Sequence, residues 1–462
     1  MTNIAIIGAG GYVFPLRLIG DILSHDALRD AHFALMDIDA AKLERVAAEA
    51  RELIAHHGLP AQVLATTNRR EALRDADYVI VTFQVGGLEA YRLDVEIPRK
   101  YGLDQTVGDT LGPGGVMRFL RSSAAYSEIA EDMLELCPDA LLINYANPMA
   151  MNCWFLSRLG VKTVGLCHSV QNTTHMLAKH LEVPYEEIQY TSAGINHQAW
   201  LLELKRGSED LYPRLRNIMR REHLERTGLR EMSADHGDHS EHKREWTIYE
   251  GGQEAVRTSL MEMFGYFHTE SSHHASEYVP WFRKNPDTVR AFIPERWDYL
   301  HICSSHSDDG LAELLSKLKA ELKPSLEYGS TIINAMETGQ PAVIYGNVPN
   351  TGLIPNLPDG CCVEVACVVD KNGVQPTHAG RLPVQLAALN RTNVNVQELA
   401  VEAALTGKLE HVYQAIALDP LTSALLTLSE IKAMTTELLR AERQWLPQFK
   451  IDAAPVLQAA DD

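Results

Sequence analysis

The chain has 462 residues, of which 45% are hydrophobic and 22% are charged, and its formal net charge is −19. This length and balance predict a globular protein with two large domains. The acidic total, without a stripe of lysine and arginine, argues against nucleic acid or an anionic membrane as partner, because phosphate binding requires positive charge. No segment resembles a membrane span or a signal peptide, and the seven cysteines are scattered. We therefore expect a cytoplasmic protein with reduced thiols.

The N-terminus reads as a dinucleotide-binding turn. An apolar run at residues 3–7 is followed by the glycine-rich stretch 8–11 and then by apolar residues at helical spacing. In this context Gly8 supplies the backbone angles of the turn, and Gly10 lets the chain approach a pyrophosphate at the helix start. The third glycine of the standard motif would fall at Val13, so the fragment alone is equally compatible with a structural turn.

The next segment strengthens the dinucleotide interpretation. A second predicted strand, residues 32–36, ends at Asp37, and Asp39 has the position of a helix N-cap. An acidic residue at the end of this strand accepts hydrogen bonds from ribose hydroxyls and repels a 2′-phosphate. The sequence therefore predicts NAD rather than NADP.

Strand and helix patterns continue to alternate along the chain. Further strands are predicted at residues 78–83, 141–145, 163–166 and 191–195. Such alternation predicts a Rossmann-type, doubly wound parallel sheet of the lactate and malate dehydrogenase kind. We assign residues 1–198 to this NAD-binding domain. Residues 199–462 are expected to form a mixed α+β domain that completes the metal and substrate site and the oligomer.

The ends of the predicted strands indicate where a ligand would bind. In doubly wound sheets, ligands lie beyond the carboxyl ends of the strands. The loops expected to converge there are 8–11, 83–87, 146–149, 167–169 and 196–198. The residues that we assign to NAD are Gly8, Gly10, Gly11, Asp37 and Gln84.

Two of these loops carry candidate metal ligands. Cys167 follows one predicted strand and His197 follows the next. A thiolate with an imidazole suits a divalent transition metal such as Mn²⁺, with positions left for substrate oxygens. The alternative is that Cys167 belongs to the core and that His197 is a hydrogen-bonded structural histidine, since their separation matches no zinc motif.

A glycine-rich run at residues 108–115 precedes a helix that carries Arg118. Four glycines and a proline in eight residues predict an irregular loop whose backbone amides line a pocket, and Arg118 could hold an anion or a hydroxyl there. A purely structural loop fits the same composition.

Two further clusters contain titratable side chains. His236, His239 and His242 recur every third residue in a charged stretch, as in a metal comb or a solvated surface. The polar stretch that begins at Thr269 includes His274 and then Tyr278, and either could act as a general base.

Together the motifs resemble glycoside hydrolase family 4, the NAD- and metal-dependent glycosidases, and most closely its α-galactosidase branch. The resemblance spans most of the chain, and the combination of C-H-S with G-I-N-H is specific. It rests on I-G-A-G-G at 7–11, M-D-I-D at 36–39, G-D-T-L-G-P-G-G-V-M-R at 108–118, N-Y-A-N-P-M at 144–149, G-L-C-H-S-V at 165–170, G-I-N-H at 194–197 and G-Y-F-H-T-E-S-S at 265–272.

The resemblance implies roles for individual residues. It makes Cys167 and His197 the ligands of Mn²⁺ or a similar ion, and Asn147 a contact of the sugar hydroxyls. Members that act on 6-phosphoglycosides commonly have aspartate after the metal cysteine, so His168 indicates an unphosphorylated galactoside. The candidate catalytic residues are His168, His274 and Tyr278, and the candidate substrate contacts besides Asn147 are Arg118 and Arg257.

The implied function is an α-galactosidase that works by oxidation at C3, elimination, addition of water and reduction, with no net redox change. An α-glucosidase or a glycosidase for an acidic sugar, whose carboxylate Arg118 or Arg257 would bind, stays open. A lactate or malate type dehydrogenase and a non-enzymatic NAD-binding protein are more remote alternatives. We expect a homodimer or a homotetramer.

Overall fold

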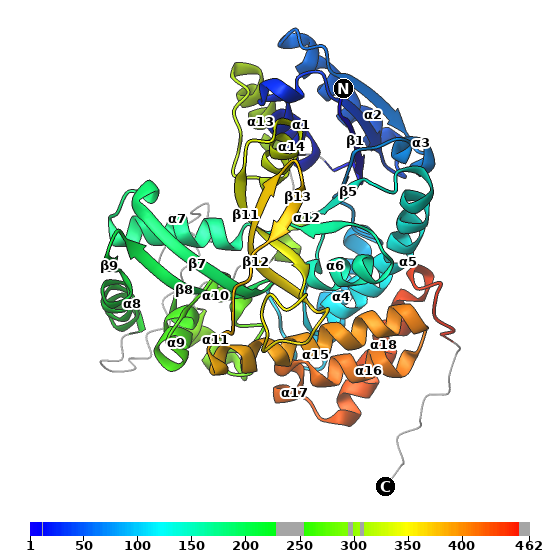
Figure 1. Ribbon diagram of the computed structural model, residues 1–462. Helices are drawn as coiled ribbons and strands as arrows, with labels where there is room; N and C mark the ends of the chain where they lie inside the picture. Colours follow the sequence, from blue (N-terminus) through cyan, green and yellow to red (C-terminus); the bar gives the residue numbers. More distant parts are fainter. Residues whose placement is uncertain (12, 228–253, 294–298, 305–308, 452–462) are drawn as a thin grey trace.

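One mixed β-sheet runs through the protein (Figure 1). The computed structural model describes residues 1–11, 13–227, 254–293, 299–304 and 309–451. Within these ranges thirteen strands form the sheet, in the order β10-β8-β7-β12-β11-β6-β5-β4-β1-β2-β3, with β13 beside β12 and β9 beside β8. The order shows that the sheet has two halves, which join between β6 and β11.

The first half is parallel and has the strand order of a dinucleotide-binding fold. Each of its neighbouring pairs is parallel. The Rossmann-type fold predicted for this part of the chain is confirmed. Its strands are β1 (Asn3–Ile7), β2 (His32–Met36), β3 (Gln62–Thr66), β4 (Tyr78–Val81), β5 (Leu141–Asn144) and β6 (Thr163–Gly165).

The second half is antiparallel. Its strands are β7 (Ile188–Ile195), β8 (Gln198–Arg206), β9 (Glu209–Asp210), β10 (Phe267–His268), β11 (Ala342–Pro349), β12 (Cys362–Asp370) and β13 (Gly373–Pro376). The prediction that residues 191–195 join the parallel sheet is wrong, because β7 pairs antiparallel with both β8 and β12. The reason is the connection: only two residues separate β7 from β8, and such a turn can join only antiparallel strands.

A row of four residues crosses the junction between the halves. Gly165 of β6 pairs with Asn347 of β11, Asn347 pairs with Glu364 of β12, and Glu364 pairs with Gly194 of β7. The end of β6 and the end of β7 therefore lie at the same level, although β11 and β12 separate them.

Helices cover both faces of the sheet. In the first part of the chain they are α1 (Phe14–Leu23), α2 (Ala40–His56), α3 (Arg69–Leu73), α4 (Gly87–Lys100), α5 (Gly112–Leu136), α6 (Met149–Arg158) and α7 (Ser169–Leu181). As predicted, Asp39 caps α2, since its carboxylate accepts from the amides of Ala41 and Lys42 at 3.1 Å.

The later helices pack on the earlier ones. Helices α15, α16 and α18 lie against α4, α5 and α6, and α14 lies against α1. They are α8 (Tyr212–Thr227), α9 (Ala255–Phe264), α10 (Ser272–Ala275), α11 (Pro286–Phe292), α12 (Tyr299–Ser304), α13 (Asp309–Ala320), α14 (Tyr328–Thr338), α15 (Val384–Thr406), α16 (Leu409–Leu418), α17 (Pro420–Leu425) and α18 (Leu428–Glu442). None of the helices within the described ranges is long and apolar enough to cross a membrane.

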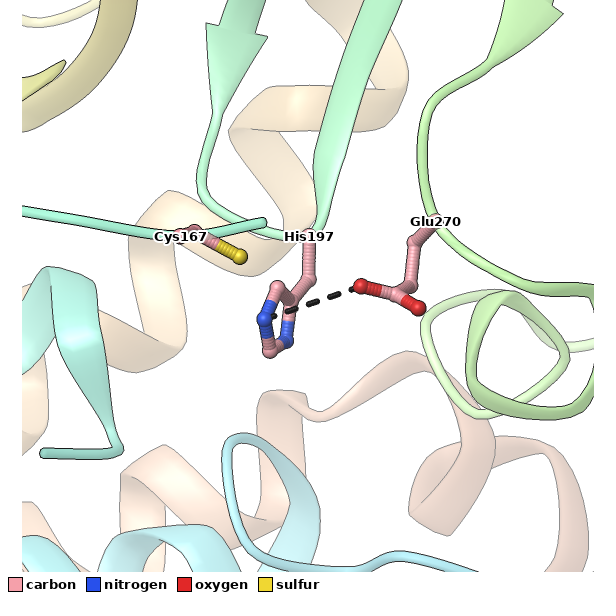
Figure 2. A group of neighbouring side chains, drawn as sticks. All are labelled: Cys167, His197 and Glu270. Carbon is pink, nitrogen blue, oxygen red and sulfur yellow. Dashed lines mark ion pairs between the residues drawn. The ribbon is translucent and has the colours of Figure 1, made fainter. Parts of the chain in front are cut away.

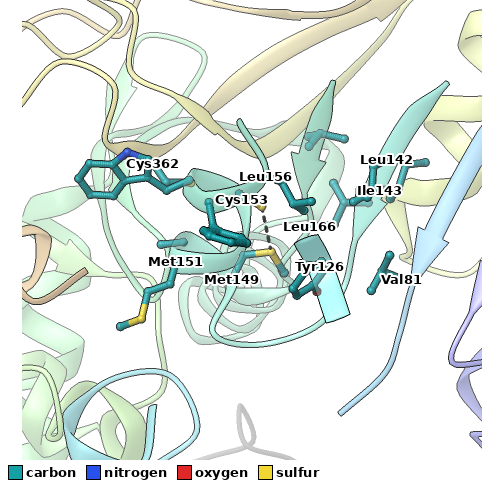
Figure 3. Packing of buried hydrophobic residues seen from close by; sticks show 14 of the residues in the cluster. Val81, Tyr126, Leu142, Ile143, Met149, Met151, Cys153, Leu156, Leu166 and Cys362 are labelled. Carbon is teal, nitrogen blue, oxygen red and sulfur yellow. Dashed lines mark hydrogen bonds between the residues drawn. The ribbon is translucent and has the colours of Figure 1, made fainter. Parts of the chain in front are cut away.

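The core continues through the junction of the two halves. Figure 3 shows Met149, Cys153 and Leu156 of α6 in one buried cluster with Leu142 of β5. A Cβ atom on Gly165 would lie 2.4 Å from Sδ of Met149 and 2.5 Å from Sγ of Cys153, so the end of β6 requires glycine here. The predicted domain boundary after residue 198 falls at the start of β8, and the sheet continues across it.

Candidate active site

The glycine turn after β1 brings three strand ends together. Gly8 has a φ of +90°, in the left-handed region that favours glycine. The amides of Gly8 and Ala9 both donate to the carbonyl of Met36, at 2.9 and 3.0 Å, which ties the end of β1 to the end of β2. A Cβ on Gly8 would lie 2.7 Å from the amide nitrogen of Phe83, so the loop after β4 also closes against this turn.

Asp37, the carboxylate that was predicted to bind the ribose, contacts this turn. Oδ2 of Asp37 accepts from the amide of Gly10 at 2.8 Å, and a Cβ on Gly10 would meet that oxygen at 2.7 Å. At Gly11 a Cβ would come no closer than 3.5 Å to Pro15, so sterics impose no glycine there. Ile38, next to Asp37, is 91% exposed. A carboxylate with a bare apolar side chain beside it fits the ribose and the base of a dinucleotide.

The other predicted cofactor residue, Gln84, lies in the loop after β4. Its side-chain amide donates to the carbonyl of Gly87 at 2.9 Å, which shapes this loop next to the glycine turn. The structure thus brings all five predicted NAD residues to the carboxyl edge of the parallel half.

Three potential metal ligands lie together at the junction of the two halves (Figure 2). Ligand atoms of Cys167, His197 and Glu270 all lie within 4.8 Å of one another, and Nε2 of His197 is 3.6 Å from Oε2 of Glu270. The Ser169 hydroxyl lies 2.8 Å from the sulfur of Cys167 and donates to Glu270 at 2.9 Å. Sulfur, nitrogen and oxygen donors in one group fit a divalent transition metal.

The row across the sheet explains how these ligands meet. Cys167 follows Gly165 by two residues and His197 follows Gly194 by three, and both glycines belong to that row. His197 thus follows an antiparallel strand rather than the predicted parallel one, but the predicted proximity of Cys167 and His197 is correct. Glu270 belongs to the polar stretch after β10, and its place among the potential metal ligands was not predicted.

The surroundings of His197 favour one ring nitrogen for the metal. Nε2 faces Glu270, whereas Nδ1 lies 2.9 Å from Nε2 of His274 and 3.0 Å from the hydroxyl of Tyr278. The residue has a φ of +59°, a strained value for a side chain of this size. Burial alone would lower the pKa of His197, but Cys167 and Glu270 raise it to about 10. Metal binding must therefore displace a proton from this ring.

The charge of Glu270 suits the same role. Burial alone would raise the pKa of its carboxyl group, but His197 and His274, together with hydrogen bonds from Ser271 and Ser169, lower it. A buried carboxylate that stays ionised needs a cation nearby. A metal ion held by this group would meet that need.

The two predicted bases, His274 and Tyr278, contact His197 at Nδ1, whereas its Nε2 faces Glu270. The hydroxyl of Tyr278 is 3.1 Å from Nε2 of His274, and both side chains are buried. Burial, with Asp109 and Glu270, raises the pKa of Tyr278 well above its usual value. The phenol is therefore protonated at neutral pH, and a role as base requires a nearby proton acceptor.

Glu277 joins this group to the glycine-rich run, a contact that sequence reasoning did not anticipate. Its carboxylate lies 3.3 Å from Nδ1 of His274 and accepts from the amides of Thr106, Val107 and Gly108 at 2.5, 2.9 and 3.1 Å. Burial alone would raise the pKa of Glu277, but these bonds and the charges of His274 and Arg283 lower it to about 2. The carboxylate thus fixes both the histidine and the loop.

His168 has a partner that no sequence signal indicated. Its Nε2 lies 2.7 Å from each carboxylate oxygen of Glu327, the residue that precedes α14. The carboxylate is buried, whereas the His168 side chain is 39% exposed. The amide of Glu327 donates to Ser325, whose hydroxyl donates to buried Asp21 of α1. The ring is therefore held in a fixed orientation at an open edge of the site.

The glycine-rich run is only partly irregular. The prediction of a loop over 108–115 is wrong for its second half, because α5 begins at Gly112. Pro113 fits the first turn of the helix, where no N–H is needed. A Cβ on Gly115 would lie 2.4 Å from the carbonyl carbon of Thr110, so this first turn touches the preceding loop too closely for a larger residue.

Asp109, Arg118 and Asn147 form a polar group beside the metal ligands. The amide of Asn147 donates to Oδ2 of Asp109 at 3.1 Å, Nε of Arg118 donates to the carbonyl of Asn147 at 3.2 Å, and Nη1 of Arg118 lies 3.9 Å from Oδ2 of Asp109. The peptide bond between Asn147 and Pro148 is cis. The two predicted sugar contacts, Arg118 and Asn147, thus lie together, and Asp109 joins them.

The structure does not place Arg257 where a substrate could reach it. The side chain is fully buried, forms an ion pair with Glu254, donates to Thr173 at 2.9 Å and stacks over Phe267. These contacts contradict the prediction that Arg257 binds the sugar, because its charge is already satisfied inside the protein. The predicted histidine comb, His236, His239 and His242, lies outside the described residues.

The fold and the site define a class of protein: the described residues combine a dinucleotide-binding fold with a cluster of potential metal ligands and a group of buried polar side chains. Residues 3–183 match the model of the family 4 glycosyl hydrolases, and residues 192–422 match the model of the C-terminal domain of that family. The chain belongs to glycoside hydrolase family 4, as the sequence motifs predicted, and it is a glycoside hydrolase.

Individual relatives cover nearly the whole chain. An α-galactosidase of Bacillus subtilis is 41% identical over 97% of this chain and 100% of its own. The crystal structure of the Bacillus subtilis protein LplD has a TM-score of 0.80 at 27% identity, over 95% of this chain and 100% of that chain. A 6-phospho-α-glucosidase from gut microorganisms, in complex with NAD and Mn²⁺, has a TM-score of 0.75 at 21% identity, over 97% and 100%.

Proposed function

We propose that this protein is an α-galactosidase that uses NAD and a divalent metal ion, Mn²⁺ first among the candidates. The observation that carries the proposal is the cluster of Cys167, His197 and Glu270, which lies at the same carboxyl edge of the dinucleotide-binding sheet as the glycine turn after β1. The α-galactosidase of Bacillus subtilis supports the sugar. The 6-phospho-α-glucosidase complex supports the pair of cofactors.

The residues present fit both groups. The turn at Gly8 and Gly10 leads into α1, whose N-terminus would receive a pyrophosphate, and Asp37 would receive the ribose hydroxyls. Cys167 and Glu270 would balance the charge of a divalent ion, and Nε2 of His197 faces the same point. When bound, NAD accepts a hydride from the sugar and returns it, and the metal ion stabilises negative charge on the sugar oxygens.

The side chains of the protein would move the protons. Asn147 and Arg118 would hold the sugar hydroxyls next to the metal ligands. Tyr278 would take the C2 proton while passing its own to His274, and Glu277 would balance the resulting charge from 3.3 Å. His168, oriented by Glu327, would protonate the leaving group from the open edge of the site.

The test is the hydrolysis of p-nitrophenyl α-D-galactoside by the purified, reduced protein, with NAD and Mn²⁺ each supplied and withheld. We expect nitrophenol release that requires both, and galactose that carries solvent deuterium at C2 when the reaction runs in D₂O. Cleavage of glucosides or uronides alone would keep the family and reject the sugar. Net accumulation of NADH would reject the glycosidase reaction in favour of a dehydrogenase.

Two further predictions accompany this proposal, one on the cellular location and one on the oligomeric state. A thiolate ligand at Cys167 must stay reduced, which supports a cytoplasmic location. We also propose a homodimer or a homotetramer, which analytical ultracentrifugation would distinguish.

A further inference from the structure

The segment that carries Glu270 has little regular structure of its own. It lies between β10, a strand of two residues, and α10, a helix of four residues. Elements this short form few backbone hydrogen bonds, so the backbone groups beside Glu270 need partners from elsewhere in the chain. Those partners decide where the Glu270 carboxylate lies relative to Cys167 and His197.

Arg257 holds this segment on one side. Its side chain is fully buried in the first turn of α9, where the helix dipole disfavours a positive charge, so α9 itself does not account for it. Its Nη1 donates to the hydroxyl of Thr173 at 2.9 Å, and that hydroxyl donates to the carbonyl of Thr269, the residue before Glu270. The direction is fixed, because a guanidinium only donates and a threonine hydroxyl has one proton. Arg257 therefore orients the Thr173 hydroxyl toward the Glu270 segment.

The ion-pair partner of Arg257 holds the segment on the other side. The guanidinium donates from Nε and Nη2 to the two carboxylate oxygens of Glu254. Oε2 of Glu254 also accepts from the hydroxyl of Ser272 at 3.1 Å, and the backbone amide of Arg257 donates to the same hydroxyl at 3.3 Å. One buried ion pair thus reaches the chain on both sides of Glu270.

Helix α7 relates this arrangement to Cys167. Ser169 and Thr173 lie four residues apart, hence on the same face of α7, and Cys167 precedes the helix by two residues. The Ser169 hydroxyl donates to the Glu270 carboxylate at 2.9 Å, and one turn later the Thr173 hydroxyl donates to the carbonyl of Thr269. This face of α7 therefore contributes to the short distance, within 4.8 Å, between the ligand atoms of Cys167 and Glu270 (Figure 2).

We propose that Arg257 and Thr173 are positioning residues that hold Glu270 at the point where the metal ion would bind, so that the three ligands are arranged before the ion arrives. This inference rests on the metal site of the proposed function. Partners that orient metal ligands commonly contribute about tenfold to a hundredfold in metal affinity. Such a role also accounts for the buried charge of Arg257, since the cost of burying an ion pair is often not recovered in stability.

The test uses Thr173→Val, which keeps the size of the side chain and removes the hydroxyl that joins Arg257 to Thr269. The matched control is Thr174→Val at the next residue, which is equally buried but whose hydroxyl donates to carbonyls of its own helix. We measure Mn²⁺ affinity by calorimetry on the full chain with NAD, and the melting temperature of the metal-free protein. Both variants should melt at a lower temperature, but only Thr173→Val should bind Mn²⁺ more weakly, by about tenfold. Unchanged Mn²⁺ affinity in Thr173→Val, or an equal loss in Thr174→Val, would overturn the inference.

A double-mutant cycle separates the positioning of Glu270 from a general disturbance of the site. If Thr173 acts through Glu270, Thr173→Val should cause no further loss of Mn²⁺ affinity in a protein that already carries Glu270→Ala. Additive losses in the double variant would contradict the inference.

Arg257→Lys tests the other positioning residue. It keeps a positive charge beside Glu254 but loses the planar fork that also reaches Thr173, so Mn²⁺ should bind about as weakly as in Thr173→Val. Wild-type Mn²⁺ affinity in this variant would overturn the role of Arg257.

The proposed function is tested separately, by cleavage of the galactoside by the wild-type protein. Unchanged Mn²⁺ affinity in the variants would overturn this inference and leave the proposed function intact, whereas a wild type that binds no Mn²⁺ would overturn both.

Discussion

The two halves of the sheet prepare a ligand site in different ways. In the parallel half the cofactor turn consists mainly of backbone: Gly8 lets Phe83 pack closely against the turn, and Gly10 does the same for the carboxylate of Asp37. In the antiparallel half the side chains carry the chemistry, since Glu270 and Glu277 are both ionised although buried. The first half therefore depends on shape and the second on a balance of buried charges.

This difference makes the halves sensitive to different changes. A site that consists mainly of backbone should lose only part of its affinity for a ligand when one side chain is removed, because the backbone contacts persist. A site of buried charges should fail more severely, because each deletion leaves another charge without its partner. Four substitutions test this contrast.

The largest effect is expected at the metal cluster. Glu270→Ala removes one of three ligands and leaves His197 without its carboxylate. We expect Mn²⁺ affinity to fall by at least about tenfold to a hundredfold and kcat/KM by roughly a thousandfold, about 4 kcal/mol. Calorimetric titration with Mn²⁺ and the nitrophenyl assay measure the two effects. Glu262→Ala, an exposed carboxylate on α9, is the control. Wild-type Mn²⁺ affinity in Glu270→Ala would remove Glu270 from the metal site.

The next effect concerns stability. Glu277 has its pKa lowered to about 2 in the folded protein, so its ionised form stabilises the fold above the ordinary pKa, and this stability is lost as the pH falls toward 2. Glu277→Gln should therefore cost about 3 kcal/mol at pH 7, and the difference from wild type should shrink between pH 4.5 and pH 2. Thermal unfolding across this range measures it, with exposed Glu128→Gln as the control. A difference independent of pH would mean that packing, not charge, explains the effect.

A smaller effect is expected in the parallel half. Asp37→Ala removes the acceptor for the Gly10 amide and for the ribose. We expect NAD to bind about thirtyfold more weakly, about 2 kcal/mol, with unchanged Mn²⁺ affinity. The control is Asp39→Ala, which removes the cap of α2 and should lower the melting temperature without weakening NAD. Equal losses of NAD and Mn²⁺ affinity in Asp37→Ala would show that the two halves are not separate in function.

The smallest effect lies at the junction. Glu364 is buried, its Oε1 accepts from Asn347 at 3.2 Å, and its Oε2 has no hydrogen-bond partner in the described part of the chain. Burial raises its pKa from 4.5 to about 7, so the wild-type protein loses stability as the pH rises from about 4.5 to about 7. In the metal-free protein, Glu364→Gln should gain on the order of 1 kcal/mol relative to wild type between pH 5 and pH 6. Melting curves at the two pH values measure this gain, and a gain that falls with pH would contradict it.

The sequence predicted those parts of the site that depend on neighbours along the chain. Gly8 and Gly10 directly follow a strand, and Asp37 follows the next, so fold logic alone could place them. Cys167 and His197 were also predicted, although the prediction for His197 assumed that residues 191–195 form a parallel strand, whereas β7 is antiparallel to its neighbours. The antiparallel direction of β7 depends on β12, which lies far along the chain, and no local pattern encodes that pairing.

The partners that were missed share a physical reason. Glu327 approaches His168 from 159 residues away and Glu277 approaches Thr106 from 171. Such contacts follow from packing of whole elements, and a single glutamate outside a helix or strand gives no periodic signal for them. Arg257 shows the converse error, because an arginine near a polar motif looks like a ligand contact until its buried partner Glu254 is known.

The row that joins Gly165 to Gly194 through Asn347 and Glu364 also sets an order of events during synthesis. Cys167 and His197 leave the ribosome early, but the two strands that hold them at the same level are made more than a hundred residues later. Domains fold as their residues emerge, so the parallel half can form its cofactor turn before β11 and β12, which lie between Cys167 and His197, have been made. The metal site can then form only late, after β12 has been inserted between β7 and β11.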